Sequence, residues 1–365
     1  MEEDDPYGWF IADFGSLALQ CVGCITQFYG TWEDMAIVAA CSFIWLVVRR
    51  LVIRRYNLIF GSIEVLVVAF ITGAVTSFIW RYIYAVKELF MCHIFTIFLS
   101  SMYVYFPGSE IVFGAYEVYV GNFIHGSSRL IGALIRLMYM SFGLLIGWQC
   151  FGRGLLVYEE DFGEIGNSLI MGSSCPAFSA DVFNIEPWWL VAFVFTLILT
   201  PLALIEFKVR PRDMLIPGIT TYVTLVLNEV LNHGCDFGTC TQLPSYINNC
   251  IILFVGANVA YVFGYFYSYP AVNSLSSVIL VFAPGASTMV RILNQMGREH
   301  GITNESVITT TSDLFANVGM VGVSCALGII LASSYWSVIM SRKDMKGNGS
   351  MQKKRVYFSY RGQQY

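Results

Sequence analysis

Charged residues are scarce in this sequence. Asp, Glu, Lys and Arg make up 13% of the 365 residues, hydrophobic residues make up 56%, and the mean hydropathy is +0.63. Soluble domains carry roughly 25% charged residues, because their water-facing surface needs them. The shortage of charge therefore excludes an ordinary soluble domain of this size. We also expect no nucleic-acid partner.

Several chemical signatures are missing as well. The ten cysteines show none of the paired spacing that is typical of a zinc site. The sequence has no phosphate-binding loop, no hydrolase motif and no His, Cys and carboxylate set with ligand spacing. Its acidic start, residues 1–6, differs from the basic start of a cleavable signal peptide. We therefore expect no cofactor, no bound metal and no enzymatic activity.

Long apolar segments follow one another along almost the whole chain. Because backbone polar groups in lipid must be paired within their own segment, these segments predict transmembrane helices. At roughly 20 residues per span, the chain has room for about ten. The predicted fold is an all-α polytopic membrane protein in contact with lipids. Its predicted spans are 9–29, 34–48, 57–80, 88–106, 128–150, 188–205, 214–233, 247–267, 271–290 and 308–338.

The distribution of Lys and Arg predicts the orientation of these spans. Fourteen basic residues fall on the side that holds both termini, and five fall on the other side. Since basic residues near span ends favour the cytosol, we expect both termini there. The fourteen are Arg49, Arg50, Arg54, Arg55, Lys208, Arg210, Arg212 and the seven beyond residue 340, and the five are Arg81, Lys87, Arg153, Arg291 and Arg298.

Two Pro-Gly pairs occupy matching places in the chain. One is Pro107-Gly108-Ser109 at the fourth span, and the other is Pro284-Gly285-Ala286-Ser287 in the ninth. Each span is the fourth in a set of five, and an odd number of spans gives two halves of opposite topology. We therefore expect two inverted five-helix repeats with Pro-Gly-interrupted helices, although a plain kink at each Pro is the alternative. The expected regions are a first repeat at 1–150, an outer loop at 151–187, a second repeat at 188–340 and a basic cytosolic tail at 341–365.

The Pro-Gly pairs also predict a solute site. Pro lacks an N–H group and Gly loosens the backbone, so nearby backbone groups lose their helical partners. Such groups persist at membrane depth only where water, protein or solute meets them. Helix starts after Ser109 and Ser287 have positive dipole ends suited to a carboxylate. The predicted site lies between the fourth and ninth spans.

Ionisable residues inside the spans are further candidates, since a buried charge costs roughly 2.5–3.5 kcal/mol to insert. Glu117 and Arg129 flank one short turn and are expected to pair, either structurally or in contact with solute or proton. Glu64 has no basic residue near it in sequence, so it is either a proton carrier or a structural acid. The proton-coupling candidates are Glu64, Glu117 and Asp313, and the other intramembrane candidates are Asp13, Arg136, Glu229 and His93.

Two further patterns indicate structural roles. Gly143 and Gly147 have the small-xxx-small spacing that lets membrane helices pack closely. Cys175, Cys235 and Cys240 fall in predicted outer loops, where a disulfide is permitted if that side is extracellular or lumenal. The alternative for these cysteines is free thiols without a role.

The first half of the sequence resembles a known family. The segment Trp32–Ile37 (WEDMAI), the basic turn after the second span and the run from Phe106 to Trp148 are similar to the threonine/serine exporter family, including its fungal pheromone-regulated membrane relatives. The second half, at 214–222 and 256–285, resembles the family's second five-span domain more faintly. The matching pattern has a Pro-Gly pair, an acidic residue, a glycine, and a Gly-x-x-Arg that opens the next span. Its positions here are Pro107, Gly108, Glu117, Gly121, Gly126 and Arg129.

The resemblance implies a secondary transporter that exports threonine, serine or a similar small polar solute, driven by an ion gradient. The solute is an amino acid or a carboxylate. Family members usually carry a soluble region before the first span, and this sequence starts almost at the membrane. That departure favours the alternative, a non-transporting scaffold subunit, so the chain is expected alone, as a homo-oligomer or in a larger membrane complex. The solute-binding candidates are Pro107, Gly108, Ser109, Glu117, Arg129, Pro284, Gly285 and Ser287.

Overall fold

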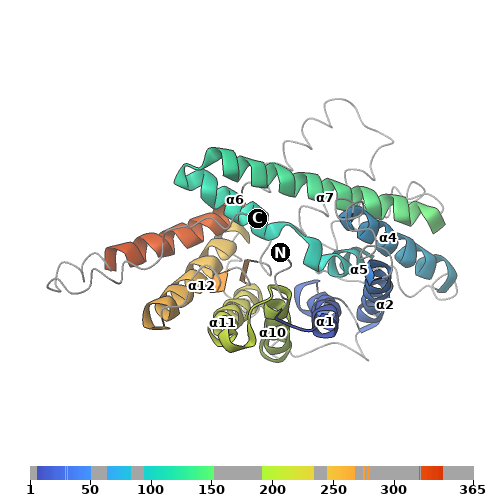
Figure 1. Cartoon of the computed structure of the whole chain (residues 1–365), viewed down its shortest axis with the longest axis horizontal. Coiled ribbons are helices and arrows are strands. Elements are labelled where there is room, and N and C mark those ends of the chain that lie inside the picture. The colour runs from blue at the N-terminus through green and yellow to red at the C-terminus, as the bar shows by residue number, and fades with distance from the viewer. Residues whose placement is uncertain are drawn as a thin grey trace.

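The computed structural model is helical, with no strand in the part of the chain it describes (Figure 1). That part comprises residues 6–28, 30, 32–50, 64–83, 94–151, 191–233, 245–267, 274–275, 278–279, 320 and 322–339. Four described helices are long and apolar enough to cross a membrane, as the composition predicts. They are Phe10–Phe28, Phe123–Cys150, Tyr246–Tyr267 and Gly322–Ile339.

The first half contains six described α-helices and one short 3₁₀ turn. The predicted fourth span, 88–106, contains α5 and η4, and the sequence did not predict α6 as a separate helix after it. The predicted fifth span begins five residues early, at Phe123. The elements are α1 (Trp9–Phe28), α2 (Trp32–Val48), α4 (Glu64–Ile83), α5 (Ile94–Ser101), η4 (Tyr103–Tyr105), α6 (Gly108–Val120) and α7 (Phe123–Phe151).

The second half is described in part. Its order agrees with the sixth to eighth predicted spans, but most of 268–319 lies outside the described residues, so the inverted repeat stays a prediction. The elements are the π-helical turn η5 (Val191–Phe195), α10 (Thr196–Glu206), η6 (Pro211–Asp213), α11 (Leu215–His233), α12 (Ser245–Tyr267) and a helix over 322–339.

The fourth span is interrupted at Pro107. Steric contact with a following proline disfavours helical backbone angles, and Phe106 accordingly has an extended conformation with ψ 126°. Pro107 then stands at the N-cap of α6, where its missing N–H costs no helical hydrogen bond. Residues 106–108 are all buried. The Pro-Gly pair therefore breaks the helix inside the protein.

Helices α6 and α7 form a hairpin closed by Gly121. This glycine has a φ of +98°, in the left-handed region, and the Asn122 N–H donates to the Glu117 carbonyl at 2.9 Å. The hairpin lies at the junction of two hydrophobic cores, because Ile111 packs into a core with α4 and α7 while Val112 packs into one with α12 and 322–339. In Figure 1, α6 accordingly lies between α7 and α12.

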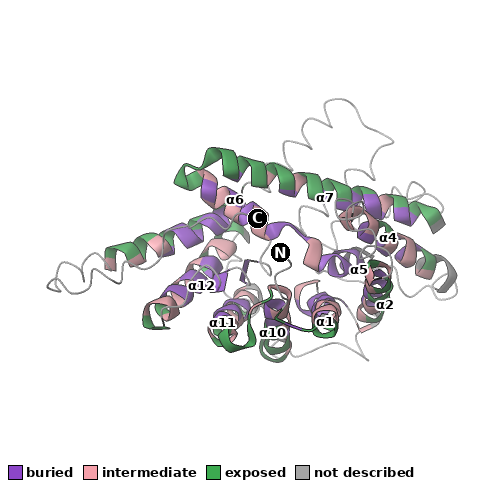
Figure 2. Cartoon of the chain, viewed as in Figure 1, coloured by how far each residue is buried: buried purple, intermediate pink, exposed green. Residues whose placement is uncertain are grey.

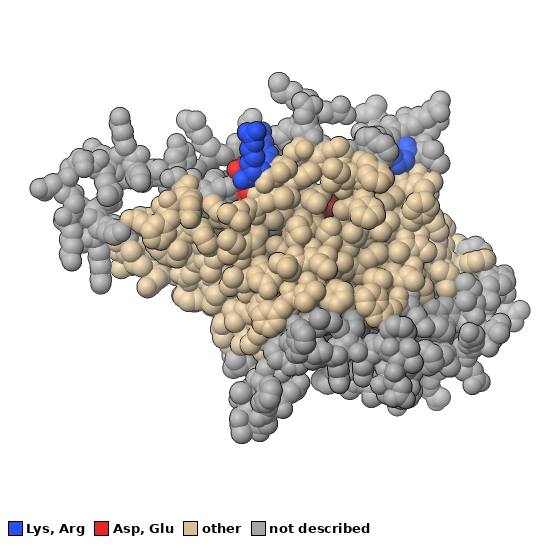
Figure 3. Space-filling model, turned by 90° about the horizontal axis from the view of Figure 1, so that it is seen from below, with Lys and Arg blue, Asp and Glu red and all other residues tan. Residues whose placement is uncertain are grey.

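The outward face of α7 is apolar and exposed (Figure 2). Large side chains there include Ile124, Ile131 and Phe142, each more than half exposed. On the face shown in Figure 3, described Lys, Arg, Asp and Glu side chains gather along one edge, above a broad belt of other residues. Such a belt suits contact with lipid.

The close packing predicted at Gly143 and Gly147 is present between α4 and α7. The two helices run in the same direction, since Gly143 lies against Leu66 and Gly147 against Phe70. A Cβ atom on Gly147 would stand 2.1 Å from the Phe70 carbonyl oxygen, and one on Gly73 would stand 2.3 Å from that of Leu144. The backbones therefore touch without side chains between them.

We predict that Gly147→Ala separates α4 from α7. The added methyl group meets backbone that cannot rotate away, so the free energy of unfolding should fall by about 1–3 kcal/mol. Gly132→Ala on the same helix is the matched control, because a Cβ there meets nothing within 4 Å. Thermal unfolding in detergent measures both. Equal melting temperatures for the two variants would contradict this packing.

Candidate functional site

Aromatic residues surround the helix break. The Trp45 Nε1 of α2 donates a hydrogen bond to the Tyr105 hydroxyl oxygen at 2.7 Å, just before Pro107. Tyr103 is buried with its ring edge-on to Phe28, and its hydroxyl has no hydrogen-bond partner among the described groups. A buried hydroxyl without a partner is unfavourable, so this region has unused capacity for polar contacts.

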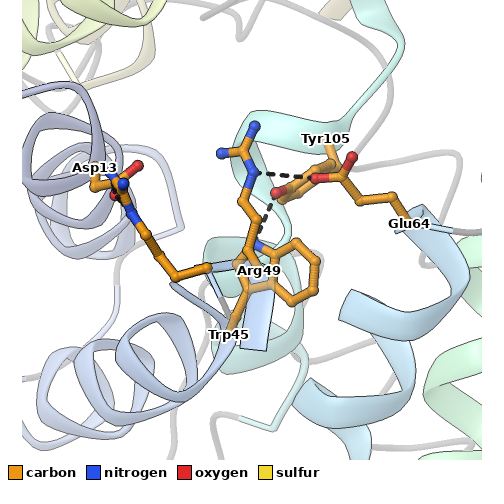
Figure 4. Close-up of polar contacts among 6 residues, drawn as sticks. Asp13, Trp45, Arg49, Glu64 and Tyr105 are labelled. Atoms are coloured by element: carbon orange, nitrogen blue, oxygen red, sulfur yellow. Dashed lines mark hydrogen bonds and ion pairs between the residues drawn. The ribbon is translucent and has the colours of Figure 1, made fainter. Parts of the chain in front are cut away.

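An ion pair lies beside these aromatic residues (Figure 4). Arg49, directly after α2, approaches Glu64 at the first turn of α4 with 3.3 Å between Nε and Oε1. The Glu64 Oε1 is buried yet makes no hydrogen bond to the described residues. Glu64 had no basic neighbour in sequence, and the structure brings one from the preceding helix. The pair has charge attraction without hydrogen-bond geometry.

A second ion pair lies one residue along the chain. The Arg50 Nε donates to the Asp13 Oδ2 at 2.6 Å and joins α2 to α1. Glu206 of α10 hydrogen-bonds Ser16 and interacts electrostatically with Arg49. Charges from α1, α2, α4 and α10 therefore meet at one end of these helices, close to the break.

Two more ion pairs join α6 to α7. Glu117 approaches Arg129 with 3.3 Å between Oε2 and Nε, and Glu110 approaches Arg136 with 2.7 Å between Oε1 and Nη1. The predicted pairing of Glu117 with Arg129 is thus present. The sequence reasoning missed Glu110. The two glutamates of α6 are seven residues apart, and so are the two arginines of α7, which follows the Gly121 turn. That spacing puts each pair on facing sides of an antiparallel hairpin.

The structure separates residues that the sequence placed in one site. Glu117 lies nine residues beyond Gly108, about 13 Å along α6 at 1.5 Å per residue, so the Glu117–Arg129 pair is at the far end of that helix. Arg49, Glu64 and Tyr105 are the polar groups beside the break instead. Several candidates fall outside the described residues, namely Pro284, Gly285, Ser287, Asp313, His93, Cys175, Cys235 and Cys240, and for Glu229 the structure describes only the backbone, in α11.

Sequence reasoning also missed a buried carboxyl near the start of α2. Asp34 is 5% exposed and interacts electrostatically with Cys24 of α1. Within the sequence it appears only as part of WEDMAI, next to Glu33, and nothing local distinguishes the buried acid from its neighbour. Its burial depends on the packing of α2 against α1.

Comparison with known proteins agrees with this geometry. Residues 1–151 match the family described as "putative threonine/serine exporter". The resemblance seen around Pro107 and Arg129 is confirmed over this region, which contains the break, the hairpin and the four ion pairs given above for the described residues. The match and the four long apolar helices support integral membrane localisation.

A fungal relative extends the similarity into the second half. Pheromone-regulated membrane protein 10 of Kluyveromyces lactis is 24% identical over 324 residues, which are 86% of this chain and 31% of the relative. The chain therefore spans about a third of the relative's length. No solved structure matches the chain.

We predict that the two ion pairs between α6 and α7 contribute differently to stability. The Glu117 side chain is 10% exposed and that of Glu110 is 32% exposed. Arg129→Gln leaves a buried carboxylate without its counter-ion and should lower the free energy of unfolding by about 1–3 kcal/mol. Arg136→Gln should cost less than about 1 kcal/mol, as for exposed pairs.

Thermal unfolding of both variants in detergent tests this order. Adding Glu117→Gln to Arg129→Gln should recover much of the loss, because the buried charge is then gone. A larger loss from Arg136→Gln, or no recovery in the double variant, would contradict the assigned burial.

Proposed function

We propose that the protein is a secondary transporter that exports a small polar metabolite, of the threonine or serine type, coupled to an ion gradient. The observation that carries the proposal is the helix break at 106–108, buried in the protein beside the ion pair of Arg49 and Glu64. The family match over 1–151 supports the transporter class. Substrate identity and coupling are part of the proposal.

The chemistry of the break suits a solute with a carboxylate. The first N–H groups of a helix have no intrahelical acceptor, and here they belong to Gly108, Ser109 and Glu110. They also carry the positive end of the α6 dipole. We propose that a bound carboxylate or water satisfies them, and that Pro284–Ser287 supplies the matching break from the second half.

The interior of the first half contains buried polar side chains in addition to the helix break. Buried hydroxyl and amide side chains come from α1, α2, α4 and α5, and one of them, Ser42, donates to Gln20 between helices. In a bilayer such groups are favourable inside a bundle, where they find partners. The set comprises Gln20, Thr26, Ser42, Thr72, Thr76, Ser77, Thr96, Ser100 and Ser101.

Coupling to protons is proposed to use Glu117. A proton on this buried carboxylate would end its attraction to Arg129 and loosen the hairpin between the two cores. A protonation event would then change how α6 packs against both halves. Glu64 and Asp313 are the other coupling candidates.

We predict that replacing Pro107 and Gly108 together by Ala abolishes efflux. Alanine restores a backbone N–H at 107 and favours helix at both positions, so the chain should continue from α5 toward α6 without the break. Efflux of preloaded radiolabelled threonine and serine from proteoliposomes measures the effect. Gly132→Ala, a site with open space, is the matched control.

Efflux by the Ala-Ala variant equal to that of the control would contradict a site at the break. The amount of variant protein in the membrane fraction shows whether insertion is retained. A wild-type protein that inserts but moves neither threonine nor serine would instead favour the non-transporting scaffold.

A further inference from the structure

We propose that Arg49 and Glu64 bind the two charged ends of a zwitterionic amino acid, Arg49 the carboxylate and Glu64 the ammonium. The inference rests on the proposed transport function and names its substrate class. It assigns Glu64 a binding role, whereas sequence reasoning considered it as a proton carrier. It also places recognition at the break and not at Glu117 and Arg129.

The first argument is the contrast between two adjacent arginines. Arg50 donates from Nε to Asp13 at 2.6 Å, within hydrogen-bond geometry. Arg49 stands 3.3 Å from Glu64 without a hydrogen bond, and the Glu64 oxygen is buried. Leaving a buried carboxylate oxygen unsatisfied costs free energy. The Arg49–Glu64 pair therefore retains hydrogen-bond capacity that its neighbour has used.

The second argument is the orientation of Arg49. In Figure 4 its terminal nitrogens extend beyond Nε, away from Trp45, and among the described residues they make no hydrogen bond. Asp13 and Glu206 contribute attraction at longer range, but their hydrogen bonds go to Arg50 and Ser16. A guanidinium with an open planar edge binds a carboxylate through two parallel hydrogen bonds. The Arg49 side chain is 47% exposed, so a solute can reach it.

The third argument is the connection to the break. The Tyr105 hydroxyl oxygen accepts from Trp45, which leaves the Tyr105 O–H as a donor for a carboxylate or a solute hydroxyl. Tyr105 lies two residues before Pro107, so a solute held there lies next to the interruption of the span. Tyr105 thereby connects the proposed solute site to the start of α6.

Charge balance favours a zwitterion over a simple ion. Arg49 and Glu64 together are neutral, and a zwitterion inserted between them pairs each charge without adding a net one. A lone carboxylate would neutralise Arg49 and leave Glu64 without a cation, and a lone amine would do the reverse. Unpaired charge is costly in a partly buried site.

The test measures direct binding to the full-length protein in detergent by titration calorimetry with three ligands. Threonine carries both charges, 3-hydroxybutyrate lacks the ammonium, and 1-amino-2-propanol lacks the carboxylate. Each analogue loses one charge-assisted contact, so the wild type should bind threonine at least about tenfold more tightly than either analogue. Glu64→Gln should weaken threonine about tenfold and should not weaken 3-hydroxybutyrate, because the carboxylate that competes for Arg49 is then neutral.

Arg49→Gln should weaken threonine and 3-hydroxybutyrate and should not weaken 1-amino-2-propanol, because Glu64 then has no competing cation. In each case, continued binding of the ligand that is not weakened shows that the variant is folded. Arg50→Gln is the matched control, since it removes the same charge one residue away and should preserve the ligand preference. An equal loss for all three ligands, or the same pattern in Arg50→Gln, would overturn the assignment.

Failure of this inference differs from failure of the proposed function. Threonine efflux by the wild type, together with unchanged ligand preference in Arg49→Gln and Glu64→Gln, would overturn the zwitterion site alone. A wild type that neither binds nor exports threonine or serine would overturn the transport proposal, and with it this site.

Discussion

The missing N–H of Pro107 determines much of this architecture. Pro107 disfavours helical angles at Phe106, and the chain passes from the end of α5 at Ser101 through η4 to a new helix, α6, that starts at Gly108 inside the protein. The new direction of α6 carries it between two hydrophobic cores, with Ile111 in one and Val112 in the other. The first N–H groups of α6 have no acceptor within that helix, and they lie close to Tyr105 along the chain. Fold and candidate site thus share one cause.

A second constraint is the free-energy cost of burying charged side chains, and ion pairing lowers that cost. Asp13, Glu64, Glu110 and Glu117 each have an arginine partner. The two hairpin pairs follow from a seven-residue spacing on antiparallel helices, so they stabilise a geometry that the Gly121 turn already imposes. The Arg49 pair connects the end of α2 to α4, and the Arg50 pair connects it to α1. Their geometry depends on how α1, α2 and α4 pack.

This difference explains what the sequence could predict. The break at Pro107 and the pairing of Glu117 with Arg129 across the Gly121 turn depend on one short segment of chain. The spacing of Gly143 and Gly147 predicts close packing but does not identify α4 as the partner helix. The partner of Glu64 and the burial of Asp34 depend on the rotation of one helix against another, which hydropathy does not specify. Hydropathy did not predict the helix over 108–120 for a related reason. Its mixed polar and apolar residues face α7 and the two hydrophobic cores.

The four ion pairs given for the described residues differ in the distance between nitrogen and oxygen. Arg50 with Asp13 and Arg136 with Glu110 lie at hydrogen-bonding distances, and they connect α2 to α1 and α7 to α6. The Arg49–Glu64 and Arg129–Glu117 pairs are both 3.3 Å apart, with a buried carboxylate oxygen that lacks a hydrogen bond. They also lie at opposite ends of the segment that runs from the break to the Gly121 turn. The carboxylate oxygens of Glu64 and Glu117 are therefore held by longer contacts than those of Asp13 and Glu110.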